Sequence, residues 1–467
     1  MRGEGEILLV STYELGHAPH GIALTAAFLE RAGYRPAALD LAVEPFDEDR
    51  VRRARLIALS VPMHTALRLG LGAARRIRAL NPGAALCFHG LYAPLNARHL
   101  ASAAPVAILG GECEEELVAL AQALESGGDL GRFLQGGGTA SRVRLDFPVP
   151  SRRGLPPPAR YARLVDAAGA ERIAGYTEAS RGCLHWCRHC PIPPIYRGRF
   201  FAIPLETVLS DVAQQVAAGA THLTFGDPDF LNGPGHALRV ARALRERFPG
   251  VTFDFTAKVE HLTRRPEAVA ELSAAGAVFV TSAVESLSDE VLSRLDKGHT
   301  RADAFRAFEV CAGAGLALRP TLVPFTPWST LEDYLELLEV FRARGWLPLL
   351  DPVQLSIRLL VPPGSLLLEA GPRRPGAPAP ADPIPGLEEL DEAALTWRWS
   401  HPDPRMDRLQ RKVAAAVEAG VARRADPAAL TAEVEALALA AAGRDHVHVV
   451  RPDDGRRAPR LTESWFC

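Results

Sequence analysis

Lysine is nearly absent from this sequence. Of its 53 basic residues only Lys258, Lys297 and Lys412 are lysines, and 55 acidic residues leave a formal charge of −2. A chain so close to neutral lacks the positive surface that drives nucleic-acid binding. It also lacks any apolar run near the ~18–20 residues that span a bilayer, and its first ten residues have no signal-peptide pattern. We therefore expect a cytoplasmic protein with no nucleic-acid or membrane partner.

Cysteine is scarce as well, and its number is odd. The seven residues are Cys87, Cys113, Cys183, Cys187, Cys190, Cys311 and Cys467. In a reducing compartment this pattern argues against a disulfide framework and indicates metal or thiol chemistry. A chain of 467 residues with 48% hydrophobic content has room for about two to four domains, each with its own core.

Residues 1–130 alternate between short apolar segments and helical periodicity. The expected strands are Ile7–Ser11, Ala37–Leu41, Leu56–Val61, Ala84–His89 and Val106–Leu109, with helices such as Gly21–Ala32, Leu67–Leu80 and Glu114–Glu125 between them. This rhythm predicts an α/β, doubly wound, Rossmann-like parallel sheet that binds ligands at the carboxyl ends of its strands. A connector rich in glycine and proline follows at 131–170.

A second α/β series occupies residues 171–370. Its expected strands are Ile173–Ala179, His222–Phe225, Thr252–Ala257, Val278–Val284, Ala317–Val323 and Val353–Leu359. Six such units predict a partial (βα)6 barrel with its chemistry at the carboxyl rim of the strands. A proline-rich linker (371–386), a helical C-terminal region (387–450) and an extended tail ending in cysteine (451–467) are expected to follow.

The segment 179–191, ASRGCLHWCRHCP, follows the first strand of the second series. Three thiolates spaced C-x3-C-x2-C can hold three corners of a cubane iron–sulfur cluster, whereas ferredoxin-type clusters use four cysteines. The fourth iron then keeps an open position for catalysis. A zinc site completed by His185 or His189, or a chance grouping, is the alternative, but structural zinc prefers four closed ligands. Placement at the rim of a barrel favours the cluster.

In this spacing the sequence resembles the radical SAM superfamily over roughly residues 171–365. The resemblance implies that Cys183, Cys187 and Cys190 ligate a [4Fe-4S] cluster, which a donor such as flavodoxin or ferredoxin reduces so that S-adenosylmethionine (SAM) is cleaved. The family's Gly-Gly-Glu-like motif, which holds the amino group of SAM, corresponds to a segment that departs from Gly-Gly-Glu and contains Gly226, Asp227 and Asp229.

Two further residues of the barrel are expected to contact SAM. Glu285 matches the acid that reaches the ribose hydroxyls in this superfamily. Arg319 suits the methionyl carboxylate because its planar fork binds carboxylates through two bonds, with a structural ion pair as the alternative. Lys258 and Lys297 also lie in the barrel; either is a candidate for chemistry or simply a surface cation.

The first α/β series resembles the cobalamin-binding domains that precede the barrel in one branch of this superfamily. The resemblance rests on the ending 108–116, ILGGECEEE. No Asp-x-His-x-x-Gly motif is present, so cobalamin would bind without that histidine ligand, or the domain is an empty relic. His64, His89 and Tyr92 are candidate loop contacts, each with a purely structural alternative. A nicotinamide site is not favoured because no G-x-G-x-x-G follows a strand.

The tail 461–467, LTESWFC, resembles the end of a radical SAM subfamily that terminates in Cys-Sec-Ala-Glu-Pro (CUAEP) or Cys-Cys-Ala-Glu-Pro (CCAEP). We therefore expect Cys467 to be a catalytic residue, and we hypothesise a selenoprotein whose chain continues past it. The alternative is an ordinary exposed thiol. A mobile cysteine–selenocysteine pair would suit binding of a soft element or a metal.

The leading hypothesis is a radical SAM transferase that modifies a small molecule, with cobalamin-dependent methylation as the simplest use of both domains. One alternative is transfer of the aminocarboxypropyl or another group of SAM to a soft acceptor such as arsenic or selenium. A second alternative is a non-catalytic iron–sulfur or cobalamin redox sensor.

Overall fold

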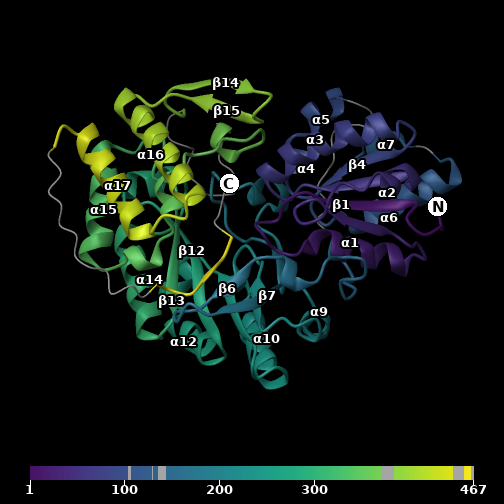
Figure 1. Ribbon diagram of the computed structural model, residues 1–467, viewed down its shortest axis with the longest axis horizontal. Coiled ribbons are helices and arrows are strands. Elements are labelled where there is room, and N and C mark those ends of the chain that lie inside the picture. The colour runs from purple at the N-terminus through teal and green to yellow at the C-terminus, as the bar shows by residue number, and fades with distance from the viewer. Residues whose placement is uncertain (104–106, 129, 135–142, 370–382, 445–456, 464–467) are drawn as a thin grey trace.

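Two sheets built mainly of parallel strands lie side by side in the computed structural model (Figure 1). The structure describes residues 1–103, 107–128, 130–134, 143–369, 383–444 and 457–463. Most of the expected linker 371–386 and the residue Cys467 lie outside these ranges. Among the described residues, no helix combines the length and apolar character needed to cross a membrane.

The N-terminal sheet has five parallel strands in the order β2-β1-β3-β4-β5. The strands are β1 (Ile7–Ser11), β2 (Ala37–Asp40), β3 (Leu56–Ser60), β4 (Ala85–His89) and β5 (Ala107–Leu109). Every residue of β1 and β3 is buried, as both faces of the sheet are covered, and this accounts for their uninterrupted apolar sequences. The predicted doubly wound sheet is confirmed.

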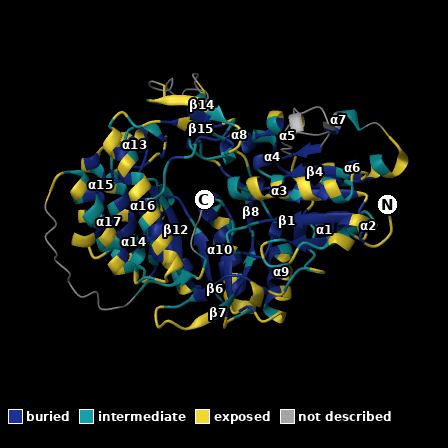
Figure 2. Cartoon of the chain, turned by 45° about the horizontal axis from the view of Figure 1, so that its top comes forward, coloured by how far each residue is buried: buried dark blue, intermediate teal, exposed yellow. Residues whose placement is uncertain are grey.

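Helices cover both faces of this sheet (Figure 2). Ile7 and Leu9 of β1 share a core with α1 and α6, whereas Leu8 and Val10 share one with α2 and α3. The helices are α1 (His20–Arg31), α2 (Glu48–Arg53), α3 (His64–Leu80), α4 (Tyr92–Leu95), α5 (Ala97–Ala103), α6 (Glu114–Ser126) and α7 (Gly131–Leu134). The strand order reverses between β1 and β3, and the carboxyl ends of those strands form the usual ligand crevice of such sheets.

The second sheet curls into a half-barrel in the order β13-β12-β11-β10-β7-β6-β16. Its parallel strands are β7 (Glu171–Thr177), β10 (His222–Phe225), β11 (Thr252–Thr256), β12 (Ala277–Glu285) and β13 (Ala317–Leu322); β6 (Arg163–Val165) and β16 (Arg460–Leu461) extend it antiparallel. The sixth strand expected at Val353–Leu359 is wrong. Asp351 caps a 3-10 helix over Pro352–Leu355, and only Arg358 makes a parallel bridge, to Phe325.

Helices pack on the outer face of the half-barrel around a core rich in phenylalanine. They are α9 (Leu205–Ala217), α10 (Pro234–Arg247), α11 (Val259–Arg264), α12 (Pro266–Ala274), α13 (Asp289–Arg294), α14 (Arg301–Gly313) and α15 (Leu331–Ala343). The C-terminal helices α16 (Pro404–Ala422) and α17 (Pro427–Ala441) join the same core through residues such as Leu409 and Val434. The C-terminal helices were expected, and here they extend the barrel's core.

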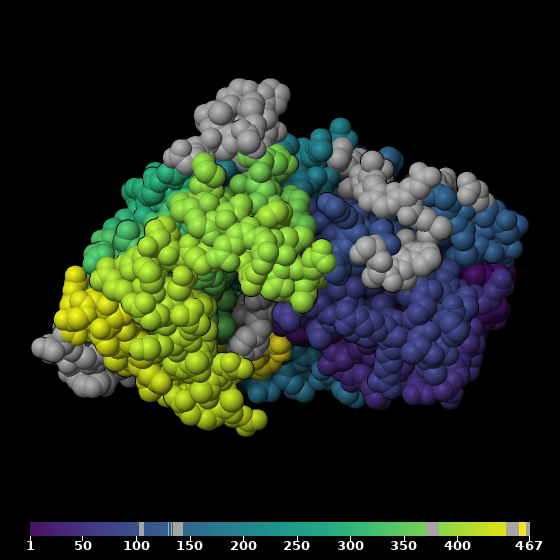
Figure 3. Space-filling model, turned by 90° about the horizontal axis from the view of Figure 1, so that it is seen from above, coloured from purple at the N-terminus to yellow at the C-terminus, as the bar shows by residue number. Residues whose placement is uncertain are grey.

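The start of the C-terminal region is not helical. Leu387–Asp391 (β14) and Thr396–Trp399 (β15) form an antiparallel hairpin. Its turn reaches the N-terminal region: Leu395 is buried in the core beside α3, and the carbonyl of Ala394 lies 2.7 Å from Nε2 of His64. Seen from above, the hairpin spans from the barrel lobe to the N-terminal lobe (Figure 3).

The tail crosses the open side of the half-barrel. Strand β16 pairs with β6, the outermost of the preceding strands, and the amide of Thr462 donates to the carbonyl of Arg163 at 2.8 Å. Tyr13 of the N-terminal region then donates to Oε1 of Glu463 at 3.2 Å. Residues 457–463 therefore run beside β6 and end between the two regions (Figure 1).

Candidate functional site

The cysteine loop begins at a tight turn. Strand β8 (Ser180–Gly182) leads into the loop, and helix α8 (Ile192–Tyr196) follows it. Strand β8 pairs antiparallel with β9 (Phe200–Ala202), which comes after α8. Gly182 has φ +80°, and a Cβ there would lie 2.5 Å from the carbonyl oxygen of Arg199. Only glycine fits this conformation without strain. The sequence Arg-Gly-Cys therefore places Cys183 directly after an obligatory glycine.

The three thiols lie near one another and largely out of solvent. Cys183 and Cys187 are buried and Cys190 is half-buried, and all three are free thiols. Burial raises the pKa of the Cys183 thiol to about 11, with the nearby Asp229 charge adding to the effect, and burial also raises the pKa of Cys190. Buried thiols without a disulfide are costly to ionise unless a metal takes the place of the proton. The donor set and its surroundings therefore fit an iron–sulfur cluster.

The two histidines of the loop face carboxylates. Nε2 of His185 lies 3.4 Å from Oδ2 of Asp229, and Nε2 of His189 lies 3.3 Å from Oε1 of Glu285. Neither arrangement points to a fourth ligand for zinc beside the cysteines, so the geometry favours the cluster alternative.

Asp227 and Gly226 tie the cysteine loop to β10. The buried carboxylate of Asp227 accepts hydrogen bonds from Oγ of Ser180 at 2.5 Å and from the amide of Ala179 at 2.9 Å. Burial raises its pKa to about 6 despite these bonds. A Cβ at Gly226 would lie 1.9 Å from the hydroxyl of Tyr176, so glycine is required there to seat that ring.

The buried Asp229 lies between two half-buried histidines, His185 and His261. Besides contacting His185, its Oδ2 lies 2.8 Å from Nδ1 of His261, and its Oδ1 caps the amide of Leu231 at 3.1 Å. Burial alone would raise the pKa of Asp229, but the two imidazoles outweigh it and lower that pKa. Asp229 is thus a buried anion at the rim, as a group that holds an ammonium must be.

Glu285 forms a second buried network on the other side of the loop. It has φ +64°, and Oε1 lies 3.2 Å from Nζ of Lys297 as well as near His189. Burial opposes ionisation, but Lys297 and His189 lower the pKa of Glu285 to about 2. The charges of Glu285, Cys187 and Cys190 raise the pKa of the buried Lys297, so this lysine is not a surface cation.

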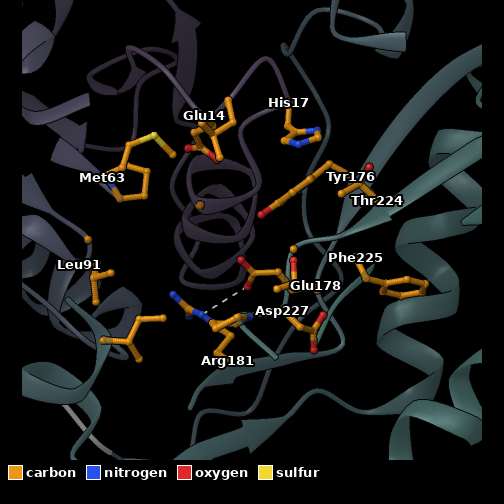
Figure 4. Close-up of a pocket in the computed structure, with 18 of the residues that line it drawn as sticks. Glu14, His17, Met63, Leu91, Tyr176, Glu178, Arg181, Thr224, Phe225 and Asp227 are labelled. Atoms are coloured by element: carbon orange, nitrogen blue, oxygen red, sulfur yellow. Dashed lines mark ion pairs between the residues drawn. The ribbon is translucent and has the colours of Figure 1, made fainter. Parts of the chain in front are cut away.

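A cavity of about 410 Å³ opens between the half-barrel and the N-terminal sheet (Figure 4). Loops after β1, β3, β4 and β5 line one side through residues such as Glu14, Met63, Leu91 and Cys113. The barrel supplies Tyr176, Glu178, Arg181 and Asp227 among others, and the tail supplies Leu461 and Glu463. The cavity therefore lies where the carboxyl ends of both sheets meet, as expected for a ligand site of either fold.

Arg181 links the two regions across this cavity. Its guanidinium lies 2.7 Å from Glu114 and 3.2 Å from Glu112 of the N-terminal region, and 3.6 Å from Glu178 of the barrel. Burial raises the pKa of Glu178 to about 8 and that of Glu112 to about 6. Glu178 therefore keeps its proton at neutral pH, although Arg181 lies beside it.

The N-terminal side of the cavity has buried polar atoms without partners. Among the described residues, Glu14 Oε1, His89 Nε2 and Glu114 Oε2 are buried and lack a hydrogen bond. Burial lowers the pKa of His17 and His89 to about 4, so both imidazoles are neutral. Unsatisfied groups at a strand-end crevice fit a bound polar cofactor, which would supply the missing bonds.

Arg319 lies deeper in the half-barrel than Glu285. The register pairs it with Thr281, and Leu322, three residues after it, pairs with Glu285, so its backbone lies about 10 Å down the strand at ~3.3 Å per residue. Its side chain lines the same cavity as Gly226 and Asp227, two of the other expected SAM contacts. His64 and Tyr92 lie in the N-terminal region near the hairpin turn. Sequence reasoning missed Arg181, Tyr176 and Glu463; only Arg181, inside the cysteine motif, carried a usable signal.

Comparisons with known proteins agree with this geometry. Residues 177–338 match the model of the Radical SAM superfamily. The methyltransferase TsrM from Kitasatospora setae, solved with tryptophan substrate and a SAM analogue, has 20% identity and a TM-score of 0.57 over 73% of this chain and 71% of its own. OxsB, a cobalamin-dependent SAM radical enzyme solved with aqua-cobalamin and SAM, has 15% identity and a TM-score of 0.67 over 89% of this chain and 67% of its own. No curated protein matched.

These structural matches show the fold: an N-terminal Rossmann-like domain, a half-barrel and a helical C-terminal region. The family match covers the cysteine loop and both buried networks around it. Residues 177–338 are therefore a radical SAM domain, which makes this chain an enzyme with a [4Fe-4S] cluster and SAM as its cofactors.

Proposed function

We propose that this enzyme is a cobalamin-dependent radical SAM methyltransferase that acts on a small molecule held between its two α/β regions. The main support for this proposal is the cavity that the two regions share. Residues Ser180–Gly182 of the cysteine loop form one wall, and the opposite wall has N-terminal residues with buried polar atoms that lack a hydrogen bond. When bound, the cluster supplies the electron that cleaves SAM, and the corrinoid carries a methyl group.

The chain's own residues would position these groups. We assign Cys183, Cys187 and Cys190 to the cluster, with Lys297 offsetting their negative charge from a buried position. Asp229 is suited to the ammonium of SAM because it is a buried anion beside the loop. Gly226 and Asp227 act by seating Tyr176 and the first turn of the loop.

Glu285 is assigned to the ribose of SAM. Its Oε1 is held by Lys297 and His189, which fixes the carboxylate in its ionised form as a hydrogen-bond acceptor. A reducing partner, flavodoxin or ferredoxin, is part of this proposal.

The test is anaerobic reconstitution of the full-length protein with iron and sulfide, followed by reduction in the presence of SAM. About four irons per chain and SAM-derived cleavage or methyl-transfer products are expected. A protein that binds the irons yet never consumes SAM would be the redox sensor instead. For cobalamin, the protein is expressed with corrinoid uptake and its absorption spectrum recorded; a colourless protein rejects that part of the proposal.

We also propose Cys467 as a catalytic residue. It follows Glu463, a cavity-lining residue, by four positions, and four residues span at most about 14 Å. Such a thiol would favour group transfer from SAM to a soft acceptor such as arsenic or selenium. Replacing Cys467 by alanine should change the SAM-derived products seen by mass spectrometry but not the cluster; an unchanged product set contradicts the role.

The CUAEP/CCAEP relationship remains a prediction at the level of the gene. The codons after that of Cys467 test it directly. A stop codon other than UGA, or a frame without Ala-Glu-Pro beyond it, contradicts the selenoprotein hypothesis.

A further inference from the structure

Two charged side chains face the cavity from the middle of the half-barrel without pairing with each other. Asp254 of β11 and Arg319 of β13 both line it. In the part of the chain that the structure describes, no carboxylate forms an ion pair with Arg319. A cation and an anion on one buried wall, each without a full complement of partners, indicate a ligand that carries both opposite charges.

The surroundings of Arg319 make it an anion site. Its guanidinium carbon lies 5.9 Å from the ring centre of Phe279, on β12 between the two charged residues. Burial lowers the pKa of Arg319 to about 10, and the nearby positive charges of Arg460 and Arg457 also lower it. The negative charges of Asp351 and Asp254 raise this pKa but do not outweigh the lowering. An anionic group bound there would relieve both the desolvation and the repulsion.

Only one of the two carboxylate oxygens of Asp254 accepts hydrogen bonds from the described residues. Thr224 donates to its Oδ1 at 2.7 Å, and Nε2 of His222 lies 2.8 Å from the same atom. Its Oδ2 has no donor among the described residues, although the side chain lies on the cavity wall. A free carboxylate oxygen in such a place suits an ammonium group.

These contacts lie deeper in the cavity than the residue proposed for the SAM ribose. Leu322, three residues after Arg319, pairs with Glu285, so the backbone of Arg319 lies about 10 Å below Glu285 along the strand direction. Asp254 pairs in register with Phe279, which is lower still than Thr281. The pair therefore serves a second small molecule in the same cavity.

We propose that the substrate is an α-amino acid, with its carboxylate on the Arg319 fork and its ammonium on Asp254. Phe279 lies between the two and lets the backbone of the substrate pass over an aromatic face. Phe225 and Tyr176 line the same cavity and suit an apolar side chain. This inference rests on the proposed function and names its substrate class.

The experiment uses the reconstituted full-length enzyme with SAM and a panel of the twenty protein L-amino acids, with binding measured by ligand-observed NMR. Any amino acid that binds is then compared with its decarboxylated amine and its deaminated acid. Binding of at least one amino acid is expected, with both analogues at least about 10-fold weaker, since a hydrogen-bonded charge contributes one to two decades of affinity.

Arg319→Met should weaken that binding about 10- to 100-fold, and Asp254→Asn should weaken it about 10-fold. The exposed Arg411→Met on α16 is the matched control and should bind as the wild type does. The iron content and the far-UV circular dichroism of all three variants should match those of the wild type, which shows that they fold and load the cluster.

Two results overturn the inference while the proposed function stands: no amino acid binds although SAM is consumed, or Arg319→Met binds the amino acid as well as the wild type does. Loss of SAM consumption in the wild type would instead defeat the proposed function.

Discussion

The two α/β regions present the carboxyl ends of their strands to one cavity, yet their carboxylates have different partners. In the barrel, Asp227 accepts a hydrogen bond from Ser180 of the cysteine loop, and Glu285 pairs with Lys297. In the N-terminal region, Oε1 of Glu14 and Nε2 of His89 are buried without a hydrogen bond among the described residues. We therefore expect Asp227 and Glu285 to be held in place before a ligand binds, whereas a ligand would supply the missing partners of Glu14 and His89.

The largest expected effect breaks the barrel side alone. Replacing Cys183 by alanine should abolish both iron incorporation and SAM consumption. The proposed cluster needs three cysteine ligands for three of its irons, and two thiolates do not suffice. Corrinoid binding by the N-terminal crevice should persist. Cys311→Ala is the control, since Cys311 is a buried thiol in the outer core of the barrel. Iron in Cys183→Ala equal to that of the control would refute the cluster assignment.

A second substitution tests the preorganised charges. Lys297→Met leaves the buried Glu285 with only His189 beside it and should lower the free energy of unfolding of the cofactor-free protein by about 3–5 kcal/mol. Adding Glu285→Gln should recover most of that loss. Urea unfolding measures both, and Lys412→Met, at an exposed lysine, should change little. Equal stability of the single and double variants would mean that the pair is not coupled.

A third comparison sets one buried histidine against another. His222 in the barrel has both ring nitrogens within 2.9 Å of partners, so His222→Phe should lower the free energy of unfolding by about 1–3 kcal/mol. His89 in the N-terminal crevice has an unsatisfied Nε2. His89→Phe should therefore leave apo stability within about 0.5 kcal/mol while weakening corrinoid binding. Thermal unfolding measures the stability of each variant, and an absorbance titration measures its corrinoid binding. Similar losses of stability in His222→Phe and His89→Phe would contradict the proposed difference between the two histidines.

The smallest effect concerns pH. Burial raises the pKa of Glu178 from 4.5 to about 8, so between these values the folded protein keeps a proton that the unfolded chain has lost. Its contribution to stability is complete below pH 4.5 and is lost as the pH rises towards 8. For the cofactor-free protein between pH 6.5 and 8, Glu178→Gln should flatten the fall in stability by up to about 1.4 kcal/mol per pH unit. Parallel pH profiles for the wild type and the variant would contradict this.

Local pattern predicted much of the fold and the cluster site. Strands β1, β3 and β10 lie within a residue of their expected bounds because fully buried strands are continuous apolar runs. The cysteine loop could be found in the sequence because its three cysteines lie within eight positions of one another. The strand expected at Val353–Leu359 failed since Asp351 caps a helical turn that begins with Pro352, a start signal that outweighs the β-branched residues after it.

The cavity was harder to foresee because its wall comes from distant segments. Nothing near Leu395 signals burial beside α3, and the hairpin there is held by Trp399, whose indole donates to the carbonyl of Leu359 at 2.9 Å. Likewise the height of Arg319 in the barrel depends on strand register, which a linear motif does not carry.

The strap formed by residues 457–463 has a consequence for how the enzyme is made. A ribosome releases the N-terminal sheet and the cysteine loop long before the segment that pairs with β6 and meets Tyr13. During synthesis the cavity thus stays open along one side until residues 457–463 have emerged, and bulky cofactors have a time window for loading. A bulky fusion placed directly after this segment would compete for the same opening.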